Sequence, residues 1–367
     1  MIRSKQPIAP QLVAVDVRMA WHSGIGRYIR EALPRVRALM PDINWRWVGK
    51  APEAWMRLDL PQTEFVEWLT PVYSWREHLC TPRALADASV QWIPHYNVTP
   101  RGCAKQVVTV HDLLPLRFVE GWKGWLRAKI VRRYLARIRR HASVVLANSA
   151  FTAGELVQVA GFSPSRIRVT PLGVNADFFG GKPCSPSQQR HFLFVGNIKP
   201  HKNLVTLLEA WAERCNQVPE VLIIVGQRES FFTSDRISSE IAACLGSRVV
   251  FTGHVDDKIL NQFLRQATAL VQPSIYEGFG LPVLEAMAVG CPVIAARAGA
   301  LPEVGGEAAL YFSPRDPKEL ASLLVQISQD ELLRERMRMA GLARARQFTW
   351  DRTAMLTAAA LREVLET

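Results

Sequence analysis

Short apolar runs alternate along the chain with stretches whose apolar positions recur at helical spacing. The runs have the length of buried strands, and no hairpin signal joins one run to the next. Strands that alternate with helices in this way are typical of an α/β fold with parallel sheets. The predicted strands include residues 12–17, 106–110, 143–147, 191–195, 221–225, 248–252 and 269–271.

A chain of 367 residues is longer than one hydrophobic core usually supports, so two domains are expected. The segment 180–189 is rich in glycine, proline and serine, which predicts a linker. We therefore predict an α/β domain over residues 1–180, a second over 181–347, and a terminal helix over 348–367.

The most informative stretch begins at Pro273, where an apolar run ends. Helix formers continue from Leu281 to a Gly-Cys-Pro stop that begins at Gly290. Pro282 suits the first turn of this helix, because a backbone N–H there would have no partner. The predicted order is strand, loop, helix and strand.

The loop in this stretch has the composition of a binding site for an electron-rich ligand. Gly278, Phe279 and Gly280 precede the helix, so their backbone N–H groups lie at a helix N-terminus. Glu277 precedes the loop, and Glu285 lies about one turn into the helix. Carboxylate acceptors beside N–H donors suit a ligand rich in hydroxyl groups.

Two further candidates follow predicted strands of the first domain. Gly24 and Gly26 come after the strand 12–17, but Ile29 replaces the third glycine of a dinucleotide-binding fingerprint, so an oxidoreductase is not indicated. His111 follows the strand 106–110 directly. Ligands of open α/β sheets bind at such carboxyl ends of strands.

Composition narrows the class of protein. The chain is 49% apolar and 21% charged, as expected of a globular protein. It has no apolar segment of membrane-spanning length and no signal-peptide core, so we expect a cytoplasmic location. The six cysteines form no Cys-x-x-Cys pair, which indicates neither a zinc site nor a disulfide framework.

The net charge of +12 indicates an anionic partner, and much of it falls in one segment. Eight basic residues lie between Lys123 and Arg140 on a predicted amphipathic helix, with Trp122 and Trp125 at its start. This helix either packs on the sheet with a solvated basic face or also contacts an anionic membrane through residues 122–140. No nucleic-acid recognition motif accompanies the charge, so nucleic acid is not expected.

Nine of the eleven tryptophans lie in the first 125 residues. Some must belong to the core, and others can form apolar platforms for a sugar or a lipid. The sequence does not sort them. The nine are Trp21, Trp45, Trp47, Trp55, Trp68, Trp75, Trp92, Trp122 and Trp125.

The stretch Pro-Ser-x-x-Glu-Gly-Phe-Gly-Leu-Pro-x-Leu-Glu-Ala-Met-Ala-x-Gly-x-Pro-Val resembles the signature of retaining glycosyltransferases of family 4, which have the GT-B fold. The resemblance extends over nearly the whole chain and is strongest in residues 190–315. It implies two Rossmann-like parallel-sheet domains, with the acceptor domain first and the nucleotide-sugar domain second. It also implies that the terminal helix crosses back to the first domain.

The resemblance assigns roles to residues in both domains. Glu277 and His111 would contact the transferred sugar, Lys202 the diphosphate and Glu285 the ribose hydroxyls. The remaining donor-binding candidates are Gly24, Gly26, Gly196, Val255, Gly278, Phe279, Gly280 and Leu281.

The diphosphate loop departs from the family pattern. The family often has an arginine just after the glycine or before the lysine, where this chain has Asn197 and His201. A second cation would come from Lys199, His201 or Arg228. The chain contains no Asp-x-Asp, so neither a metal nor another cofactor is expected.

These features predict a retaining, metal-independent hexosyltransferase that uses a nucleotide-sugar, with GDP-mannose favoured over UDP- and dTDP-sugars. The acceptor would be a saccharide or a lipid-linked saccharide of bacterial surface polysaccharide synthesis. Two alternatives stay open: a sugar-nucleotide epimerase on the same fold, and a non-catalytic nucleotide-binding scaffold.

Overall fold

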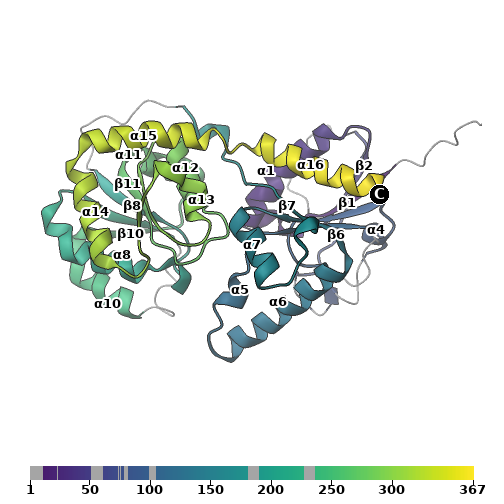
Figure 1. Cartoon of the computed structure of the whole chain (residues 1–367), viewed down its shortest axis with the longest axis horizontal. Helices are drawn as coiled ribbons and strands as arrows, with labels where there is room; N and C mark the ends of the chain where they lie inside the picture. The colour runs from purple at the N-terminus through teal and green to yellow at the C-terminus, as the bar shows by residue number, and fades with distance from the viewer. Residues whose placement is uncertain are drawn as a thin grey trace, which may run out of the picture. The chain divides into compact units, whose positions relative to one another are not determined.

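The chain folds into two compact units (Figure 1). The computed structural model describes residues 11–22, 24–50, 61–72, 74, 76–77, 82–98, 105–180, 190–226 and 236–367. The first unit consists of Met1–Leu172 and Trp350–Thr367, and the second of Gly173–Thr349. The division between the units therefore falls before the 180–189 segment that the sequence predicts as a linker.

The first unit contains a parallel sheet of seven strands in the order β3-β2-β1-β4-β5-β6-β7. Both β2 and β4 pair with β1. The chain adds β2 and β3 on one side of β1 and then adds β4 on the other side, so the strand order reverses between β1 and β4. Such a switch point leaves a crevice at the carboxyl ends of the two strands. The strands are β1 (Leu12–Asp16), β2 (Asn44–Val48), β3 (Thr63–Val66), β4 (Val90–Ile93), β5 (Gln106–Val110), β6 (Ala142–Ala147) and β7 (Ile167–Val169).

Every residue of β4 and β5 is buried, as expected of central strands that helices cover on both faces. Ser149 caps α7 by accepting a hydrogen bond from the N–H of Thr152 at 3.0 Å. The helices of this unit are η1 (Arg18–Trp21), α1 (Gly24–Leu39), α4 (Arg83–Ala86), α5 (Leu114–Arg117), α6 (Gly121–His141), α7 (Ala150–Gln158), η2 (Pro164–Arg166) and α16 (Trp350–Glu366).

The terminal helix α16 belongs to the first unit, although the second unit precedes it in the chain. It packs against α1 and contacts β4, β5 and β6. Thr353 Oγ1 donates to the carbonyl of Pro171 at 2.6 Å, and Arg168 forms a salt bridge with Glu363 at 2.6 Å.

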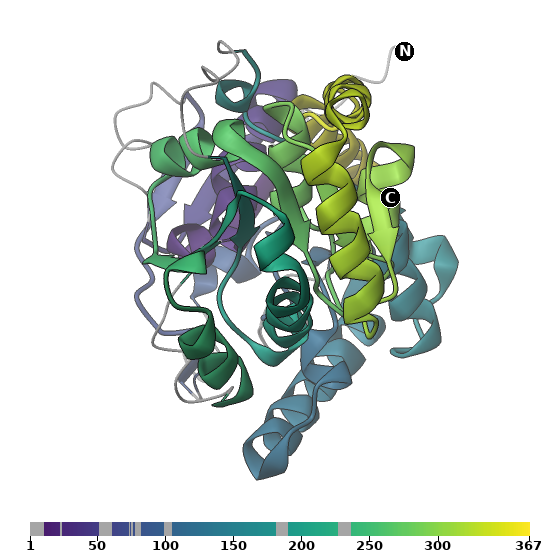
Figure 2. The same ribbon diagram turned by 90° about the vertical axis from the view of Figure 1, so that its left-hand side faces the viewer.

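The second unit contains a parallel sheet of six strands in the order β10-β9-β8-β11-β12-β13. Its switch point lies between β8 and β11, which pair directly. Helices lie on both faces of this sheet (Figure 2). The strands are β8 (His191–Val195), β9 (Val221–Val225), β10 (Val249–Gly253), β11 (Ala267–Gln272), β12 (Val293–Ala296) and β13 (Leu310–Phe312).

The helices of the second unit complete the α/β pattern. Among the described residues of the whole chain, none of the helices has the length and apolar content needed to cross a membrane. The helices are η3 (Ala176–Phe178), η4 (Pro200–Lys202), α8 (Leu204–Arg214), η5 (Cys215–Gln217), α10 (Arg236–Leu245), η6 (Gly246–Arg248), α11 (Asp257–Gln266), α12 (Leu281–Ala288), α13 (Leu301–Gly305), η7 (Gly306–Ala308), α14 (Pro317–Gln329) and α15 (Glu331–Ala345).

The structure separates the tryptophans that the sequence leaves unsorted. Trp45, Trp47 and Trp92 are core residues of the first unit, and Trp68 is 7% exposed. Three others are largely exposed, and Trp55, Trp75 and three of the cysteines lie outside the described residues. The exposed tryptophans are Trp21, Trp122 and Trp125.

Candidate active site

The switch point of the second unit brings two of the predicted site residues together. Lys202 ends η4, which follows β8, and Glu277 lies in the loop that follows β11. Because β8 and β11 are neighbours, both side chains lie at the same edge of the sheet. Lys202 Nζ is 2.6 Å from Glu277 Oε1, and both side chains are largely buried.

Three donors hold one oxygen of the Glu277 carboxylate. Besides Lys202, Oε1 accepts hydrogen bonds from the hydroxyl of Ser274 at 2.7 Å and from the amide of Gln272 at 2.9 Å. The described residues provide no donor to Oε2. The carboxylate is therefore fixed through one oxygen, and the other oxygen can accept a hydrogen bond from a ligand.

The same contacts keep Glu277 ionised. Burial by itself would raise the pKa of this carboxyl, but the ammonium of Lys202 and the hydrogen bonds from Lys202 and Ser274 outweigh burial. The pKa of Glu277 therefore lies below its ordinary value. Sequence reasoning missed Ser274 and Gln272 as supports, although Ser274 is part of the Pro-Ser-x-x-Glu pattern.

The loop after Glu277 leads into α12, as the sequence predicts. Gly280 precedes the helix with φ +107°, and a Cβ there would lie 2.8 Å from Leu301 Cδ2. Phe279 is buried with its ring against Phe348, at 5.9 Å between centroids. Leu281 begins α12, and Glu285 in its second turn is 4% exposed.

Gly299 and Ala300, which precede α13, lie in close contact with the backbone of Glu277. The N–H of Ala300 donates to the carbonyl of Glu277 at 2.9 Å. A Cβ at Gly299 would lie 2.6 Å from both the backbone N and the carbonyl O of Glu277. This close approach needs glycine, and no pattern in the sequence indicated it.

The loop that carries Lys202 is fixed by its own contacts. Asn203 adopts the left-handed conformation at φ 54°, and its side-chain amide donates to the carbonyls of Pro273 and Pro314. A Cβ at Gly196 would lie 3.5 Å from Lys202 Cε. That distance is an ordinary van der Waals contact, so the backbone φ of +153°, rather than the lysine beside it, explains the glycine.

The pKa of His201, another candidate for the second cation, lies below its ordinary value. Burial and the charges of Lys202 and Lys199 lower its pKa to about 4, although the carboxylate of Glu277 acts in the opposite direction. Lys199 is exposed, and Arg228 lies outside the described residues.

The remaining candidate of the second unit, Val255, is half-buried between β10 and α11. The side chain of Asp256 caps α11 by accepting from the N–H of Ile259 at 2.8 Å. Val255 therefore lies in a short, well-defined turn at the carboxyl end of β10, the same edge of the sheet as Lys202.

In the first unit, His111 follows β5 directly and is buried. Its Nε2 lies 2.9 Å from the carbonyl of Pro94. Because a carbonyl only accepts, Nε2 carries the proton and Nδ1 is left as an acceptor. Burial lowers the pKa of His111 to about 4, so the ring is neutral at pH 7.

Gly24 and Gly26 lie in the first turn of α1. A Cβ at Gly26 would lie 2.6 Å from the carbonyl oxygen of Ala20, so this position needs glycine for packing. A Cβ at Gly24 would meet no described atom within 4 Å. Packing within the protein thus does not explain the glycine at 24.

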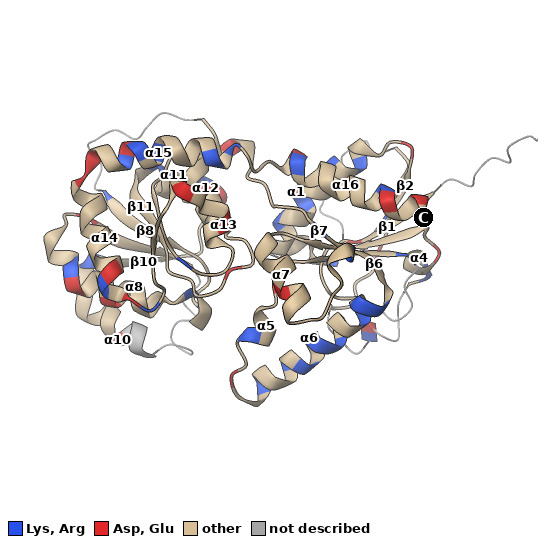
Figure 3. Ribbon diagram, viewed as in Figure 1, with Lys and Arg blue, Asp and Glu red and all other residues tan. Residues whose placement is uncertain are grey.

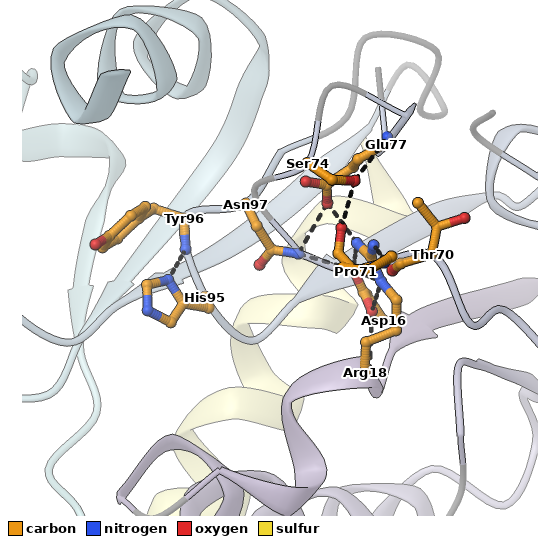
Figure 4. A network of polar contacts seen from close by, with 9 residues as sticks. All are labelled: Asp16, Arg18, Thr70, Pro71, Ser74, Glu77, His95, Tyr96 and Asn97. Carbon is orange, nitrogen blue, oxygen red and sulfur yellow. Dashed lines mark hydrogen bonds and ion pairs between the residues drawn. The ribbon is translucent and has the colours of Figure 1, made fainter. Parts of the chain in front are cut away.

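A network that the sequence did not indicate occupies the switch point of the first unit (Figure 4). The guanidinium of Arg18 contacts the carboxylates of Asp16 at 2.6 Å and Glu77 at 2.5 Å. Asn97 donates to Asp16 at 2.9 Å. Burial would lower the pKa of Arg18, but the two carboxylates raise it above its ordinary value.

The structure thus gathers Gly196, Lys202, Glu277 and the start of α12 at one edge of the second sheet. His111, Gly24 and Gly26 lie at carboxyl ends of strands in the first unit. Among the described residues, no cluster of three or more histidine, cysteine or acidic side chains is arranged to hold a metal ion.

Comparison with known proteins identifies the family. Residues 179–344 match the model of the glycosyl transferases group 1, and residues 78–178 match that of glycosyltransferase family 4. The O-antigen chain mannosyltransferase B of Escherichia coli is 31% identical over 268 residues, which cover 69% of this chain and 68% of that protein. A D-inositol 3-phosphate glycosyltransferase of a Nocardioides species is 31% identical over 240 residues, covering 59% and 52%.

Solved structures share the fold. Anabaena HepE in complex with UDP-glucose superposes with a TM-score of 0.72 at 18% identity, over 96% of this chain and 99% of that one. This confirms the predicted GT-B fold of two parallel-sheet α/β domains. The chain is a glycosyltransferase and belongs to the group 1 glycosyl transferases of family 4.

Proposed function

We propose that this enzyme transfers a sugar from a nucleotide-sugar to a hydroxyl group of a saccharide or lipid-linked saccharide in bacterial surface polysaccharide synthesis. GDP-mannose is the favoured donor, because the relative from Escherichia coli is a mannosyltransferase of the O-antigen chain. The observation that carries the proposal is the pair formed by Lys202 and Glu277 at the switch point between β8 and β11.

In this proposal both Lys202 and Glu277 contact the nucleotide-sugar donor. The ammonium of Lys202 binds the diphosphate, while Glu277 accepts a hydrogen bond from a sugar hydroxyl through Oε2. The N–H groups of the loop 278–280 bind the sugar and phosphate at the start of α12. Glu285 binds the ribose hydroxyls, and the turn at Val255 contacts the nucleobase through its backbone.

We propose that transfer retains the configuration of the sugar without a covalent enzyme intermediate. The bond from the anomeric carbon to the diphosphate breaks with its electron pair on the leaving phosphate, and the acceptor oxygen bonds to the same face. The leaving phosphate takes the proton of the acceptor hydroxyl. Glu277 is unsuited to be the nucleophile, because its lowered pKa and its three hydrogen bonds make the carboxylate a weak base.

His111 is proposed to act at the sugar from the first unit. Its lowered pKa makes it a neutral group, so it stabilises through hydrogen bonding rather than through a positive charge. Gly24 and Gly26 lie in the first turn of α1, where the helix N-terminus favours the negative charge of the diphosphate.

We propose that Lys202 and helix N-termini, rather than a divalent metal, stabilise the negative charge of the diphosphate. The sequence contains no Asp-x-Asp, the motif that chelates a metal for this purpose in other glycosyltransferases. A lysine forms charge-assisted contacts to phosphate without any metal.

A nucleotide screen tests the proposed donor. Calorimetry with GDP, UDP and dTDP gives the base preference, and transfer from radiolabelled GDP-mannose to isolated surface polysaccharide gives the activity. We expect GDP to bind at least tenfold more tightly than UDP, a difference of about 1.4 kcal/mol. Equal affinities, or tighter binding of UDP, would refute the choice of donor. Donor consumption without a transfer product would instead indicate an epimerase.

A separate observation concerns the exposed face of α6, on which positive charge is concentrated (Figure 3). The helix contains no acidic residue, and none of its Lys or Arg side chains forms a salt bridge with the described residues. Trp122 is 70% exposed and Trp125 is 56% exposed at its N-terminal end, next to the exposed Leu126 and Ile130. Figures 1 and 2 show this end of the helix standing clear of the sheet of the first unit.

We propose that this face of α6 binds an anionic membrane surface. Its buried side packs on the sheet of the first unit through Val131, Leu135 and Ile138, so the basic side remains available for lipid. Exposed indoles beside lysine and arginine are the combination that favours the interfacial region of a bilayer. A membrane location suits an enzyme whose acceptor is lipid-linked.

A further inference from the structure

A pocket of about 390 Å³ opens in the first unit at the carboxyl ends of β1, β2 and β3. Its volume lies within the range of small-molecule sites, about 300–1,000 Å³. The residues after each of these strands line it, with Arg18 and Trp21 from η1, Lys50 after β2, and Trp68 and Leu69 after β3. The pocket lies at the end of the sheet formed by β1, β2 and β3, whereas His111 follows β5, which lies beyond β4 on the other side of β1.

The wall of this pocket is apolar and aromatic where solvent reaches it. Trp21 is 56% exposed and Leu69 is 63% exposed, whereas Trp45 and Trp47 on neighbouring β2 are buried. Exposed side chains of this size on a concave surface mark a binding site. An indole ring offers a flat surface on which the C–H face of a sugar ring can pack.

The floor of the pocket is held in place by contacts within the protein. The guanidinium of Arg18 lies 3.4 Å from the centre of the Trp68 ring and donates to the carbonyl of Thr70 at 3.0 Å. Asp16 and Glu77 hold the other side of the same guanidinium (Figure 4). The charge of Arg18 is therefore already satisfied, and its task is to fix the shape of the floor.

The rim of the pocket carries the positive charge of Lys50, which the described residues do not satisfy. Lys50 and His22 are exposed, and neither forms a salt bridge or hydrogen bond through its side chain with the described residues. Among the described residues, no carboxylate belongs to the pocket lining. A ligand that enters between the rim and the indole wall gains if it carries an anionic group.

We propose that this pocket binds the acceptor substrate as a phosphorylated saccharide. The sugar packs against Trp21, and its phosphate pairs with Lys50 and accepts a hydrogen bond from the imidazole of His22. The inference rests on the proposed function, since it assigns the acceptor side of the same transfer. The phosphate belongs to either a lipid carrier or a phosphorylated glycan, and both present the same chemistry to the pocket.

Binding to the pocket is measured without turnover, so that it can fail or succeed independently of the proposed reaction. Protein labelled with [15N]tryptophan gives one indole N–H signal per tryptophan, and the variant Trp21→Phe assigns the signal of Trp21. We expect α-mannosyl phosphate to shift this signal at concentrations about tenfold lower than either methyl α-mannoside or inorganic phosphate. The variant Lys50→Gln should abolish that tenfold advantage.

A matched control comes from the second unit. Lys318→Gln changes an exposed lysine outside the pocket and should leave the titration unchanged. A Trp21 signal that does not respond to α-mannosyl phosphate would overturn the proposal. So would equal responses to α-mannosyl phosphate and inorganic phosphate, or an unchanged affinity in Lys50→Gln.

Turnover gives the second readout. With an acceptor that the wild-type enzyme uses, Trp21→Ala and Lys50→Gln should raise the acceptor KM at least tenfold and leave GDP affinity unchanged. An unchanged KM refutes the pocket, whereas wild-type protein that binds α-mannosyl phosphate but transfers no sugar refutes the proposed function alone. A short-chain lipid ester of α-mannosyl phosphate separates the two sources: tighter binding than the free sugar phosphate indicates a lipid carrier, and equal binding indicates a phosphorylated glycan.

Discussion

Separating Lys202 from Glu277 should change stability, nucleotide affinity and transfer in three different ways. The perturbation is a double-mutant cycle of Lys202→Met, Glu277→Gln and the double variant. In the wild type the two side chains are 2.6 Å apart and only 15% and 13% exposed. Each therefore depends on the other for compensation of a largely buried charge.

The contacts of Glu277 set the expected magnitudes. Lys202→Met leaves a carboxylate held only by the neutral donors Ser274 and Gln272, and should cost about 2 kcal/mol of unfolding free energy. Glu277→Gln should cost about 1 kcal/mol, because Lys202 is left without its carboxylate but can reorient toward water. The double variant should lose less than the sum, with a coupling energy of about 1–2 kcal/mol.

Nucleotide binding should separate the two residues. Lys202→Met removes a charge-assisted contact to the diphosphate and should weaken GDP binding roughly 10- to 100-fold. Glu277→Gln should keep normal affinity for GDP or bind it slightly more tightly, because Lys202 is released from its partner. Transfer by Glu277→Gln should nevertheless fall at least about a hundredfold, the scale of a lost contact in the transition state.

The assay combines urea unfolding, calorimetry with GDP and initial transfer rates on the same preparations. Lys318→Met and Glu209→Gln are matched controls, since both side chains are exposed on helices of the second unit. Near-normal transfer by Glu277→Gln would refute its place beside the sugar. Unchanged GDP affinity in Lys202→Met would refute the phosphate role, and additive stability losses would refute the coupling.

Three further predictions concern the metal, the histidine and α6. Transfer should continue in EDTA, because Lys202 is expected to meet the charge of the diphosphate; activity that EDTA abolishes and manganese restores would contradict this. His111→Asn should slow transfer about a hundredfold with normal GDP affinity, and it should also make the protein less sensitive to acid. Because the folded-state pKa of His111 is lowered to about 4 from 6.5, the unfolded chain binds the proton more readily, and stability falls as the pH drops from about 6.5 toward 4. This linkage to His111 should lower the free energy of unfolding by about 2 kcal/mol at pH 5 relative to pH 8. Equal urea midpoints of wild type and His111→Asn across this pH range would refute the prediction. Replacing Arg132, Arg133 and Arg137 on α6 by glutamine should weaken binding to anionic vesicles by about 1 kcal/mol per residue at low salt. Cosedimentation that depends neither on salt nor on these substitutions would show that the basic face of α6 is only solvated.

Much of the fold follows from local pattern. Apolar runs of strand length alternate with helical periodicity, and the observed strands β5, β6, β8, β9 and β11 overlap the predicted runs closely. A sheet buried on both faces needs strands that are apolar throughout, so its strands are visible one at a time in the sequence. The start of α12 was predictable for the same reason, since Pro282 and the glycines before it act locally.

Some candidates from pattern stay predictions. Gly24 and Gly26 lie in the first turn of α1, and their place beside the donor is untested. His201 stays a candidate for the second cation, although burial lowers its pKa to about 4. Arg228 stays a prediction, since it lies outside the described residues.

The sequence alone determined the family, the parallel sheets and the identity of Lys202, Glu277 and His111 as candidates, because a signature of adjacent residues carries that information. Only the tertiary structure decided which residues support them. Gly299 lies against Glu277 although 22 positions separate them (299 minus 277), and Arg18 meets Glu77 across 59 positions. Such contacts arise because the strand order places distant segments side by side at a switch point. Hydrophobic periodicity predicts which residues are buried, but it does not predict which strands become neighbours.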